Sequence, residues 1–308
     1  MQQNSRNKTL KGHLGELKAH AITAKSMDDI DRVAQHILRF SQRSAYKFNH
    51  TLAIIGLVLA GLSSLLSFWA QMDLSYDQRI WMRIGGFALC VFCITNICMR
   101  LSSIKQVGDD LYVRAVAINA GIERDYSFNG RSYWRELTSL FPLFNCGDDS
   151  QSITKRYLGG VDSTPFTLFE FKYVNVTTHY TTDSNGNSRQ SKSRNTIYRY
   201  GMLVQFANFN YLCLNAKRFC TKWDSASRAF NQLFKVRCAT EIQAAKFFDP
   251  KVVLAFADTF NFIKSMDVSP QSVACFELSK NVFPTKVKKP SLRKPADFVQ
   301  QLSHPTDI

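Results

Sequence analysis

The stretch from Thr51 to Ala70 reads TLAIIGLVLAGLSSLLSFWA and carries no charged side chain. A lipid hydrocarbon core of about 30 Å is crossed by about 20 apolar residues in α-helix. Core helices of soluble proteins rarely run this long without a charge or a polar face. The stretch therefore predicts a membrane-spanning helix. Because it begins only at residue 51, after a long polar segment, it does not fit a secretory signal peptide.

A second apolar run follows after a short polar connection. It extends from Ile84 to Leu101 and reads IGGFALCVFCITNICMRL. Arginines at the ends of such a run can reach the headgroups while their aliphatic stems stay in the apolar layer, which suits Arg83 and Arg100. The two runs together predict a transmembrane hairpin with spans at about residues 51–70 and 82–101.

Basic residues near the span ends predict the orientation, because Lys and Arg are enriched in cytoplasmic segments. The connecting loop offers Arg79 alone. The flanking segments are richer in such residues: Arg32, Arg39, Arg43, Lys47, Arg100, Lys105 and Arg114. Both termini are therefore expected in the cytoplasm, as in a multi-pass protein of the inner (plasma) membrane.

The charge of the chain has two explanations. Its 308 residues include 39 Lys+Arg against 24 Asp+Glu, a net charge of +15. A basic protein can bind nucleic acid, but the sequence shows no nucleic-acid motif and no basic stripe interleaved with regularly spaced aromatics. Anionic lipid headgroups of the cytoplasmic leaflet also attract basic residues close to a span. We expect contact with lipid rather than with nucleic acid.

The eight cysteines do not suggest a disulfide framework. Cys90, Cys93 and Cys98 lie inside the second span, where a thiol behaves as a small apolar group. The other five are scattered and odd in number, which favours a reducing compartment. Since further ligands are missing near Cys90 and Cys93, no metal site is predicted there.

The pattern along the chain divides it into four segments. Residues 1–27 lack apolar periodicity and are expected to form a mobile polar arm. Residues 28–124 form the hairpin with flanking amphipathic helices, the first beginning near Asp28 with Ser26 as its cap. We expect these helices to extend the spans as a cytoplasmic stalk; alternatively, the first lies flat on the membrane.

Residues 125–283 are expected to form a soluble α+β domain with a mixed, mainly antiparallel sheet. Strands are predicted over 166–178, 196–206, 210–214, 233–238 and 272–278, and helices over 136–143, 241–248 and 250–266. Between the first two strands, residues 181–195 are predicted to form a polar hairpin tip that turns at Asn185-Gly186. Gly159-Gly160 predicts a turn or bulge. Residues 284–308 are expected to be a basic tail.

Several short stretches together resemble a known bacterial family. They are Leu140–Phe144, Tyr157–Gly160, Phe169–Phe171, Tyr198–Leu203, Ala229–Val236, Ala244–Lys246 and Phe248–Val253. Their order resembles the proteins grouped as domain of unknown function 3137, over roughly residues 130 to 280. The resemblance implies a bacterial inner-membrane protein with a cytoplasmic α+β domain. It implies no reaction, no cofactor and no catalytic residue.

Two hypotheses of function remain. In the first, the soluble domain is an interaction or scaffolding module at the membrane surface, with a protein partner or a second copy of the chain. Its candidate membrane or partner contacts are Arg39, Arg43, Lys47, Arg100, Lys105, Arg189, Lys192, Arg194, Lys286, Lys288, Lys289, Arg293 and Lys294. In the second, it is an enzyme or small-ligand sensor whose site forms only in the fold, and the residues to inspect are Asp162, Glu170, Asp249 and Cys238. We favour the first, because no catalytic, cofactor or metal signature appears in the sequence.

Overall fold

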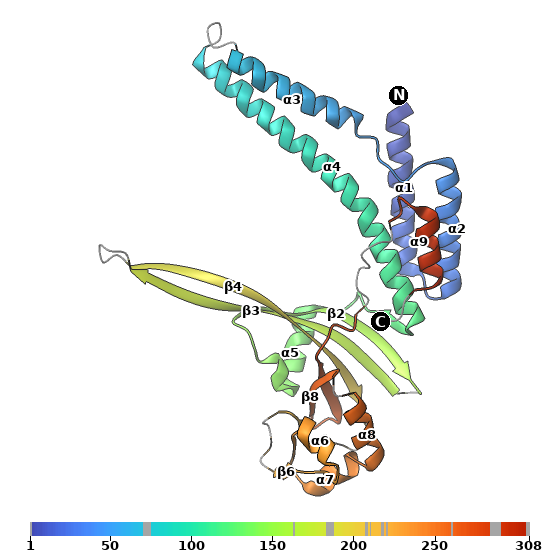
Figure 1. Cartoon of the computed structure of the whole chain (residues 1–308), viewed down its shortest axis with the longest axis vertical. Helices are drawn as coiled ribbons and strands as arrows, with labels where there is room; N and C mark the ends of the chain where they lie inside the picture. The colour runs from blue at the N-terminus through green and yellow to red at the C-terminus, as the bar shows by residue number, and fades with distance from the viewer. Residues whose placement is uncertain are drawn as a thin grey trace. The chain divides into compact units, whose positions relative to one another are not determined.

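The chain forms two compact units, residues 1–120 with 284–308 and residues 121–283 (Figure 1). This computed structural model describes residues 2–69, 75–162, 164–182, 188–206, 209, 211–216, 219, 221–259, 261–283 and 291–305. The first unit is helical and the second is built on a β-sheet. The protein is therefore α+β, as the sequence predicts.

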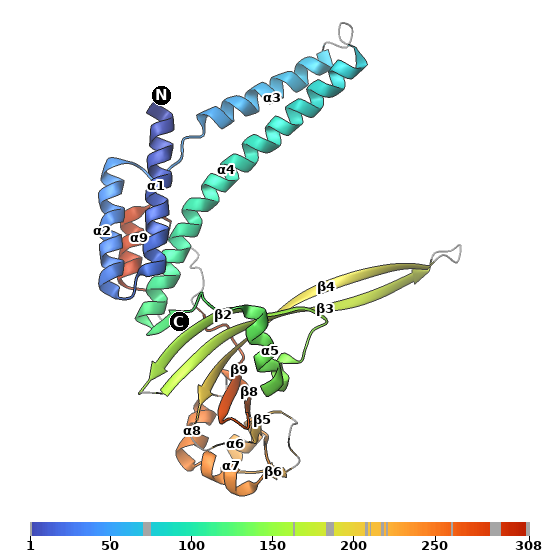
Figure 2. The same cartoon turned by 180° about the vertical axis from the view of Figure 1, so that it is seen from behind.

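The helical unit contains two apolar helices that lie side by side, α3 (Thr51–Trp69) and α4 (Tyr76–Asn119) (Figure 2). Of the described helices, α4 alone contains a segment long and apolar enough to cross a membrane, Ile80–Asn119. The described apolar run of α3, Thr51–Leu66, is shorter. Both helices leave large apolar side chains exposed, among them Leu52 at 72% and Phe87 at 72%.

The rest of the helical unit is a bundle. It combines α1 (Gln2–Thr23), α2 (Met27–Arg43), the C-terminal half of α4 and α9 (Pro295–Ser303). Their apolar side chains share one core, which includes Leu10, Ile37, Leu111 and Phe298. The N-terminal residues are thus not a mobile arm, because α1 buries Leu10, Leu14, Leu17 and Ala21 against the other helices. The predicted tail also ends in a packed helix, α9, which buries Phe298 and Leu302.

The two helices that flank the hairpin pack as a stalk. Ser26 caps α2 through a capping box with Asp29, as its position before the acidic first turn predicts. Ile30 and Ile37 of α2 share a core with Ile104 and Leu111 of α4, so α2 does not lie flat with its apolar face toward lipid. Arg114 lies inside this bundle, where its Nε donates to the carbonyl oxygen of Ala24 at 2.8 Å. It is therefore not one of the charges that face headgroups.

The sheet unit is organised around nine antiparallel strands in the order β1-β2-β3-β4-β9-β8-β5-β7-β6. The strands are β1 (Ile122–Arg124), β2 (Asp149–Val161), β3 (Thr164–Thr182), β4 (Ser188–Gln205), β5 (Leu212–Leu214), β6 (Thr221–Trp223), β7 (Val236–Cys238), β8 (Ile263–Val268) and β9 (Val273–Leu278). The predicted strands at 166–178, 196–206 and 272–278 are confirmed. The predicted strand at 233–238 is shorter, because Leu233 ends the preceding helix.

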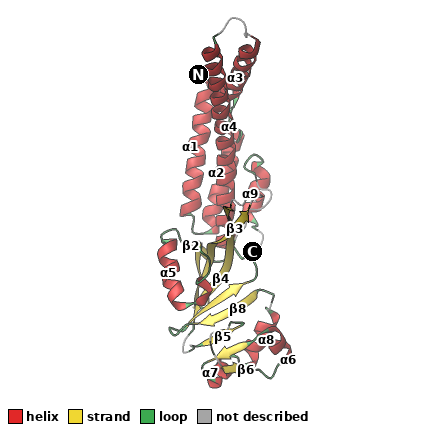
Figure 3. Ribbon diagram, turned by 90° about the vertical axis from the view of Figure 1, so that its left-hand side faces the viewer, coloured by secondary structure: helices red, strands yellow, loops and turns green. Residues whose placement is uncertain are grey.

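Helices cover both faces of this sheet (Figure 3). On one face, α5 (Gly130–Leu140) and the 3₁₀ turn Pro142–Phe144 pack on the central strands, with the Phe144 ring 5.2 Å from the rings of Phe169 and Phe171. On the other face lie α6 (Arg228–Leu233), α7 (Glu241–Phe247) and α8 (Pro250–Asp258). The prediction of a helix over 250–266 is wrong in its second half, where the chain pairs as β8.

Two glycines lie opposite phenylalanines in adjacent strands. Gly159 pairs with Phe166 and Gly201 with Phe169. A Cβ on Gly201 would overlap the Phe169 ring and the carbonyl oxygen of Phe276, so a side chain there is excluded. Gly159 and Gly160 pair in register within β2 instead of forming the predicted turn or bulge. The Phe166 ring occupies the space that a side chain at Gly159 would need.

The strands β3 and β4 continue beyond the sheet as a two-stranded ribbon (Figure 1). The pairing of β2 with β3 ends at Val174, and that of β9 with β4 begins at Tyr200. Between these points and Thr182 and Ser188, β3 and β4 pair only with each other among the described residues. Most of the predicted polar tip, residues 181–195, is thus regular strand; the predicted turn at Asn185-Gly186 lies outside the described residues.

Candidate membrane-proximal site

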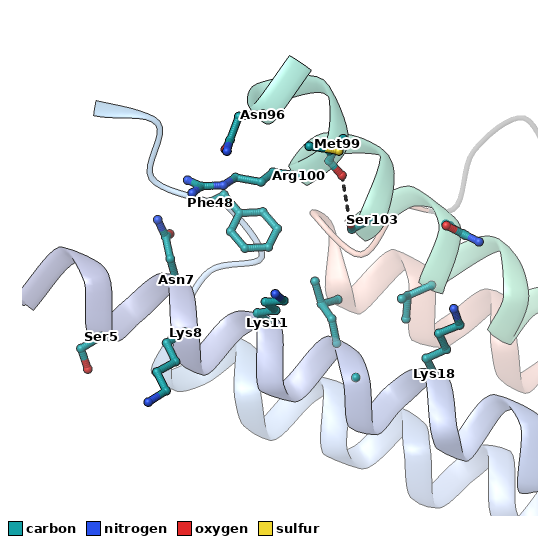
Figure 4. A pocket seen from close by; sticks show the side chains of 14 residues that line it. Ser5, Asn7, Lys8, Lys11, Lys18, Phe48, Asn96, Met99, Arg100 and Ser103 are labelled. Carbon is teal, nitrogen blue, oxygen red and sulfur yellow. Dashed lines mark hydrogen bonds between the residues drawn. The ribbon is translucent and has the colours of Figure 1, made fainter. Parts of the chain in front are cut away.

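A groove of about 870 Å³ lies in the helical unit, between α1 and the middle of α4 (Figure 4). It begins where the exposed apolar part of α4 gives way to the bundle. Its walls combine basic, amide and apolar side chains: Ser5, Asn7, Lys8, Lys11, Leu14, Gly15, Lys18, Phe48, Asn96, Met99, Arg100, Ser103, Gln106 and Val107. A volume of this size suits a small-molecule ligand.

The periodicity of α1 sets one wall of the groove. Lys8, Lys11, Gly15 and Lys18 recur at intervals of three and four, so they share one helical face. Lys11 and Lys18 reach from α1 toward α4, whereas Lys8 lies at the rim with its amine turned away (Figure 4). The neighbouring face of α1 is buried in the bundle, which fixes the helix and therefore the wall.

The face of α4 that opposes α1 is polar in the same region. Asn96, Arg100 and Ser103 recur at helical spacing and line the groove. The guanidinium of Arg100 is held in place because Nη1 donates to the carbonyl oxygen of Asn49 at 3.2 Å. It also lies 5.9 Å from the centre of the Phe48 ring. Arg100 is thus a positioned cation rather than a freely moving one.

The segment between α2 and α3 closes the end of the groove. The side chain of Asn7 bonds both backbone groups of Asn49: Oδ1 accepts from its N–H at 2.9 Å and Nδ2 donates to its carbonyl oxygen at 3.1 Å. Asn49 in turn caps the start of α3, since its Oδ1 accepts from the N–H of Thr51 at 2.8 Å. These contacts tie α1, α3 and α4 together at one level of the molecule.

A second cavity of about 310 Å³ adjoins the groove and runs between α3 and α4. Asn7, Asn96 and Arg100 line both cavities, so the two lie next to each other. Beyond these three residues and Asn49 its walls are apolar or a thiol: Leu52, Ala53, Gly56, Leu89, Phe92 and Cys93. The combined site is polar at the bundle end and apolar at the other.

The electrostatic environment of the site is positive. No Asp or Glu lines either cavity, and among the described residues no ion pair involves Lys8, Lys11, Lys18 or Arg100. Close by, burial and then the positive charges of Arg100 and Arg293 lower the pKa of His50. Uncompensated cations around an open cavity favour an anionic group within it.

The structure separates the thirteen contact residues predicted from sequence. Arg100 alone lines the groove. Arg39, Arg43, Lys47, Lys105, Arg293 and Lys294 are exposed on the helical unit without lining it, and Arg189, Lys192 and Arg194 are exposed on the ribbon. Lys286, Lys288 and Lys289 lie outside the described residues. Sequence reasoning missed Lys11 and Lys18, although the spacing of Leu10, Leu14 and Leu17 could have identified their helix.

The four residues that the enzyme hypothesis singled out each have a position or contact that belongs to the fold. Glu170 is buried and accepts from Lys155 Nζ at 2.8 Å. Asp249 caps α8 by accepting from the N–H of Val252 at 2.8 Å. Cys238 lies in the buried core, and burial raises the pKa of its thiol. Asp162 has a φ of 46° at the β2–β3 turn. Within the described ranges, no group of three or more His, Cys, Asp and Glu could hold a metal ion.

Comparisons with family models, with curated proteins and with solved structures found no match for this chain. The resemblance to domain of unknown function 3137 therefore stays a prediction from the quoted stretches.

Proposed function

We propose that this chain is an integral membrane protein of the inner (plasma) membrane, held by the α3–α4 hairpin with both termini in the cytoplasm. Its sheet unit then serves as an interaction or scaffolding module at the membrane surface. The observation that carries the proposal is the paired apolar surface of α3 and α4. Phe87, Phe92 and Leu52 are between 67% and 72% exposed, and lipid would cover them.

The contact between α3 and α4 supports this environment. A Cβ on Gly56 would lie 2.7 Å from Cys93 Sγ, and one on Gly86 would lie 2.9 Å from Ser63 Oγ. Close helix approach through small residues is typical of helix pairs in lipid, where apolar side chains gain little by leaving their surroundings. The large apolar side chains accordingly point outward.

The lengths of the helices fit one membrane. With a rise of 1.5 Å per residue, the 19 residues of α3 extend about 28 Å, close to the thickness of the hydrocarbon core. The 44 residues of α4 extend about 66 Å, so a helix that crosses the membrane continues well beyond it. The bond from Arg100 to Asn49 sets the start of α3 level with the end of the apolar part of α4.

The β3–β4 ribbon is the part of the sheet unit best suited to a partner. A two-stranded ribbon leaves backbone groups unpaired along both edges, and such edges recruit further strands. Most of its described side chains are exposed, with Tyr180 at 73%, and they include the basic residues Arg189, Lys192 and Arg194. A protein partner or a second copy of this chain could bind there.

Reporter fusions test the topology. A reporter placed after Ile308 should be active in the cytoplasm, and one inserted between residues 71 and 74 should be active on the other side. Activity of the C-terminal fusion outside the cytoplasm would contradict the orientation. Release of the chain by alkaline extraction of membranes would contradict insertion itself.

Site-specific photo-crosslinking tests the interaction module. A photoreactive residue at Tyr180 should give an adduct of one defined mass in intact membranes. The control position is Tyr126, which is 59% exposed and lies outside the ribbon. Neutralising Arg189, Lys192 and Arg194 should weaken the adduct, whereas neutralising the exposed Lys222, Lys246 and Lys251 should not. Equal adducts from both tyrosine positions would refute the ribbon as the contact.

A further inference from the structure

The groove and the cavity beside it form one amphipathic site within the helical unit. The groove of about 870 Å³ offers ammonium and guanidinium groups from α1 and α4. The adjoining 310 Å³ continues between α3 and α4 along Leu52, Ala53 and Phe92. A ligand that fills both must carry an anionic group at one end and a hydrocarbon chain at the other.

We propose that the site binds an anionic phospholipid. Its phosphate lies near Lys11 and Arg100, with the amide groups of Asn7 and Asn96 as further hydrogen-bond donors. Lys18, about two helical turns along α1 from Lys11, adds positive charge at the other end of the groove (Figure 4). One acyl chain enters the cavity between α3 and α4. The proposal deepens the proposed function and rests on it for the source of the lipid, because insertion places the groove at the level of the headgroups.

The charges of the site match this occupant. Lys and Arg side chains bind phosphate oxygens strongly, and Arg100 is already oriented by Asn49 and Phe48. An acidic residue would repel the phosphate, and none lines the two cavities. A zwitterionic lipid would bind more weakly, because the positive charge of its headgroup would be repelled by the lysines of the groove.

A glycine of α1, Gly15, lines the groove. A Cβ on Gly15 would have no atom within 4 Å, so the groove is open directly above this residue. Glycine in a helix interior is destabilising by about 0.5–1 kcal/mol relative to alanine. A large side chain at Gly15 would therefore extend into the groove and take up the space of the ligand. Gly12 on the same helix is equally open but does not line the groove, which makes it a matched control.

The test is a titration of the purified full chain in mild detergent, with bound lipid counted by native mass spectrometry. The probes are phosphatidylglycerol, phosphatidylcholine and glycerol 1-phosphate. The wild-type chain should bind one phosphatidylglycerol at least tenfold more tightly than phosphatidylcholine. Glycerol 1-phosphate separates the two sources of phosphate: if it binds as tightly as the lipid, the occupant is a soluble phosphate ester and the lipid proposal is overturned.

Two pairs of variants locate the binding. Lys11→Gln with Lys18→Gln should weaken phosphatidylglycerol binding by up to about 25-fold, at about fivefold per charge. The charge-matched control, Lys222→Gln with Lys246→Gln at exposed positions of the sheet unit, should change it less than about twofold if general attraction to a basic chain is not the cause. Gly15→Phe should block the groove without a change of charge, and Gly12→Phe should not.

Each outcome decides the proposal. Loss of binding in the groove variants but not in their controls supports it. Unchanged binding in both groove variants, or equal losses in variants and controls, overturns it. Alkaline extraction of membranes is scored separately for the wild-type chain, so failure of insertion is distinguishable from failure of the lipid site. Circular dichroism of Gly15→Phe and Gly12→Phe checks that α1 remains folded.

Discussion

The two halves of α4 use the same residue types in opposite ways. Before Arg100, the helix turns Phe87 and Phe92 outward, at 72% and 67% exposure. After Arg100, it turns Ile104 and Leu111 inward, at 2% and 0%. One continuous helix thus passes from a surface that suits lipid to a surface buried in a protein core. The change depends on what surrounds the helix rather than on its backbone.

This contrast shows why the groove lies where it does. Near Arg100 the bundle core does not fully cover the helix, so polar side chains such as Asn96 and Ser103 line an open space. In the second half, three other helices cover the apolar side chains. The boundary between the exposed half and the buried half of α4 is therefore also the place where the groove lies.

The largest effect is expected from truncating a buried side chain in the second half of α4. Leu111→Ala should reduce the free energy of unfolding of the bundle by about 2–5 kcal/mol, because it leaves a cavity among α1, α2 and α9. Phe87→Ala in the first half should change it by less than about 0.5 kcal/mol. Hydrogen exchange of α1 and α2 peptides, in detergent or nanodiscs, measures both. Equal hydrogen-exchange protection of α1 and α2 in the two variants would show that the two halves of α4 do not differ in this way.

A smaller effect is expected where α3 meets α4. Gly86→Ile should force the helices apart at a cost of about 1–3 kcal/mol, because its Cβ would meet Ser63 Oγ at 2.9 Å and the Ala60 carbonyl oxygen at 3.3 Å. The adjacent Gly85 has no atom within 4 Å of a Cβ, so Gly85→Ile is the control. Oxidative cross-linking of Gly56→Cys to Cys93 measures the pairing. If the cross-link still forms in Gly86→Ile, α3 and α4 are not in close contact at Gly86.

The smallest effect concerns the pH dependence of the bundle. His13 stacks on Phe40 with ring centroids 4.0 Å apart and bonds Tyr46 through Nε2 at 2.8 Å. Burial lowers the pKa of His13 below its ordinary value of 6.5, in part against the charge of Glu16. The unfolded chain therefore binds more protons just below pH 6.5, and stability should fall as pH drops from there toward the lower folded pKa.

Thermal unfolding between pH 7.5 and 5 measures this dependence. His13→Gln should reduce the slope, because glutamine can still bond Tyr46 but does not titrate. His20→Gln, an exposed position on the same helix, should leave the slope of the wild-type chain. A slope unaffected by His13→Gln would assign the dependence to other groups.

The parts of the fold that the sequence predicts are those with strong local patterns. The apolar run from Thr51, the capping box of Ser26 and Asp29, and the alternating strand from Phe166 each determine their element without distant contacts. The α+β class follows from the same signals. Arg100 could be singled out from the sequence because it ends an apolar run, and it does line the groove.

The parts that could not be predicted depend on distant partners. The polar sequence of α1 contains a narrow apolar stripe, and only packing against α4 and α2 buries that stripe. Strand β8 reads as a continuation of α8 because only its pairing with β9 and β5 makes it extended. The groove needs Lys11 and Arg100 together, and nothing local connects residues so far apart in the chain.

The position of α9 has a consequence for the order of events during synthesis. Leu292, Phe298 and Leu302 complete a core that Leu10 and its neighbours begin. At about 5–20 residues per second, the ribosome needs roughly a quarter of a minute to a minute to reach Leu292 after passing Leu10. During this interval the sheet unit can fold while the helices of the bundle still lack α9. The hydrophobic core of the bundle is therefore completed last. Nascent chains halted before Leu292 should remain sensitive to protease in α1.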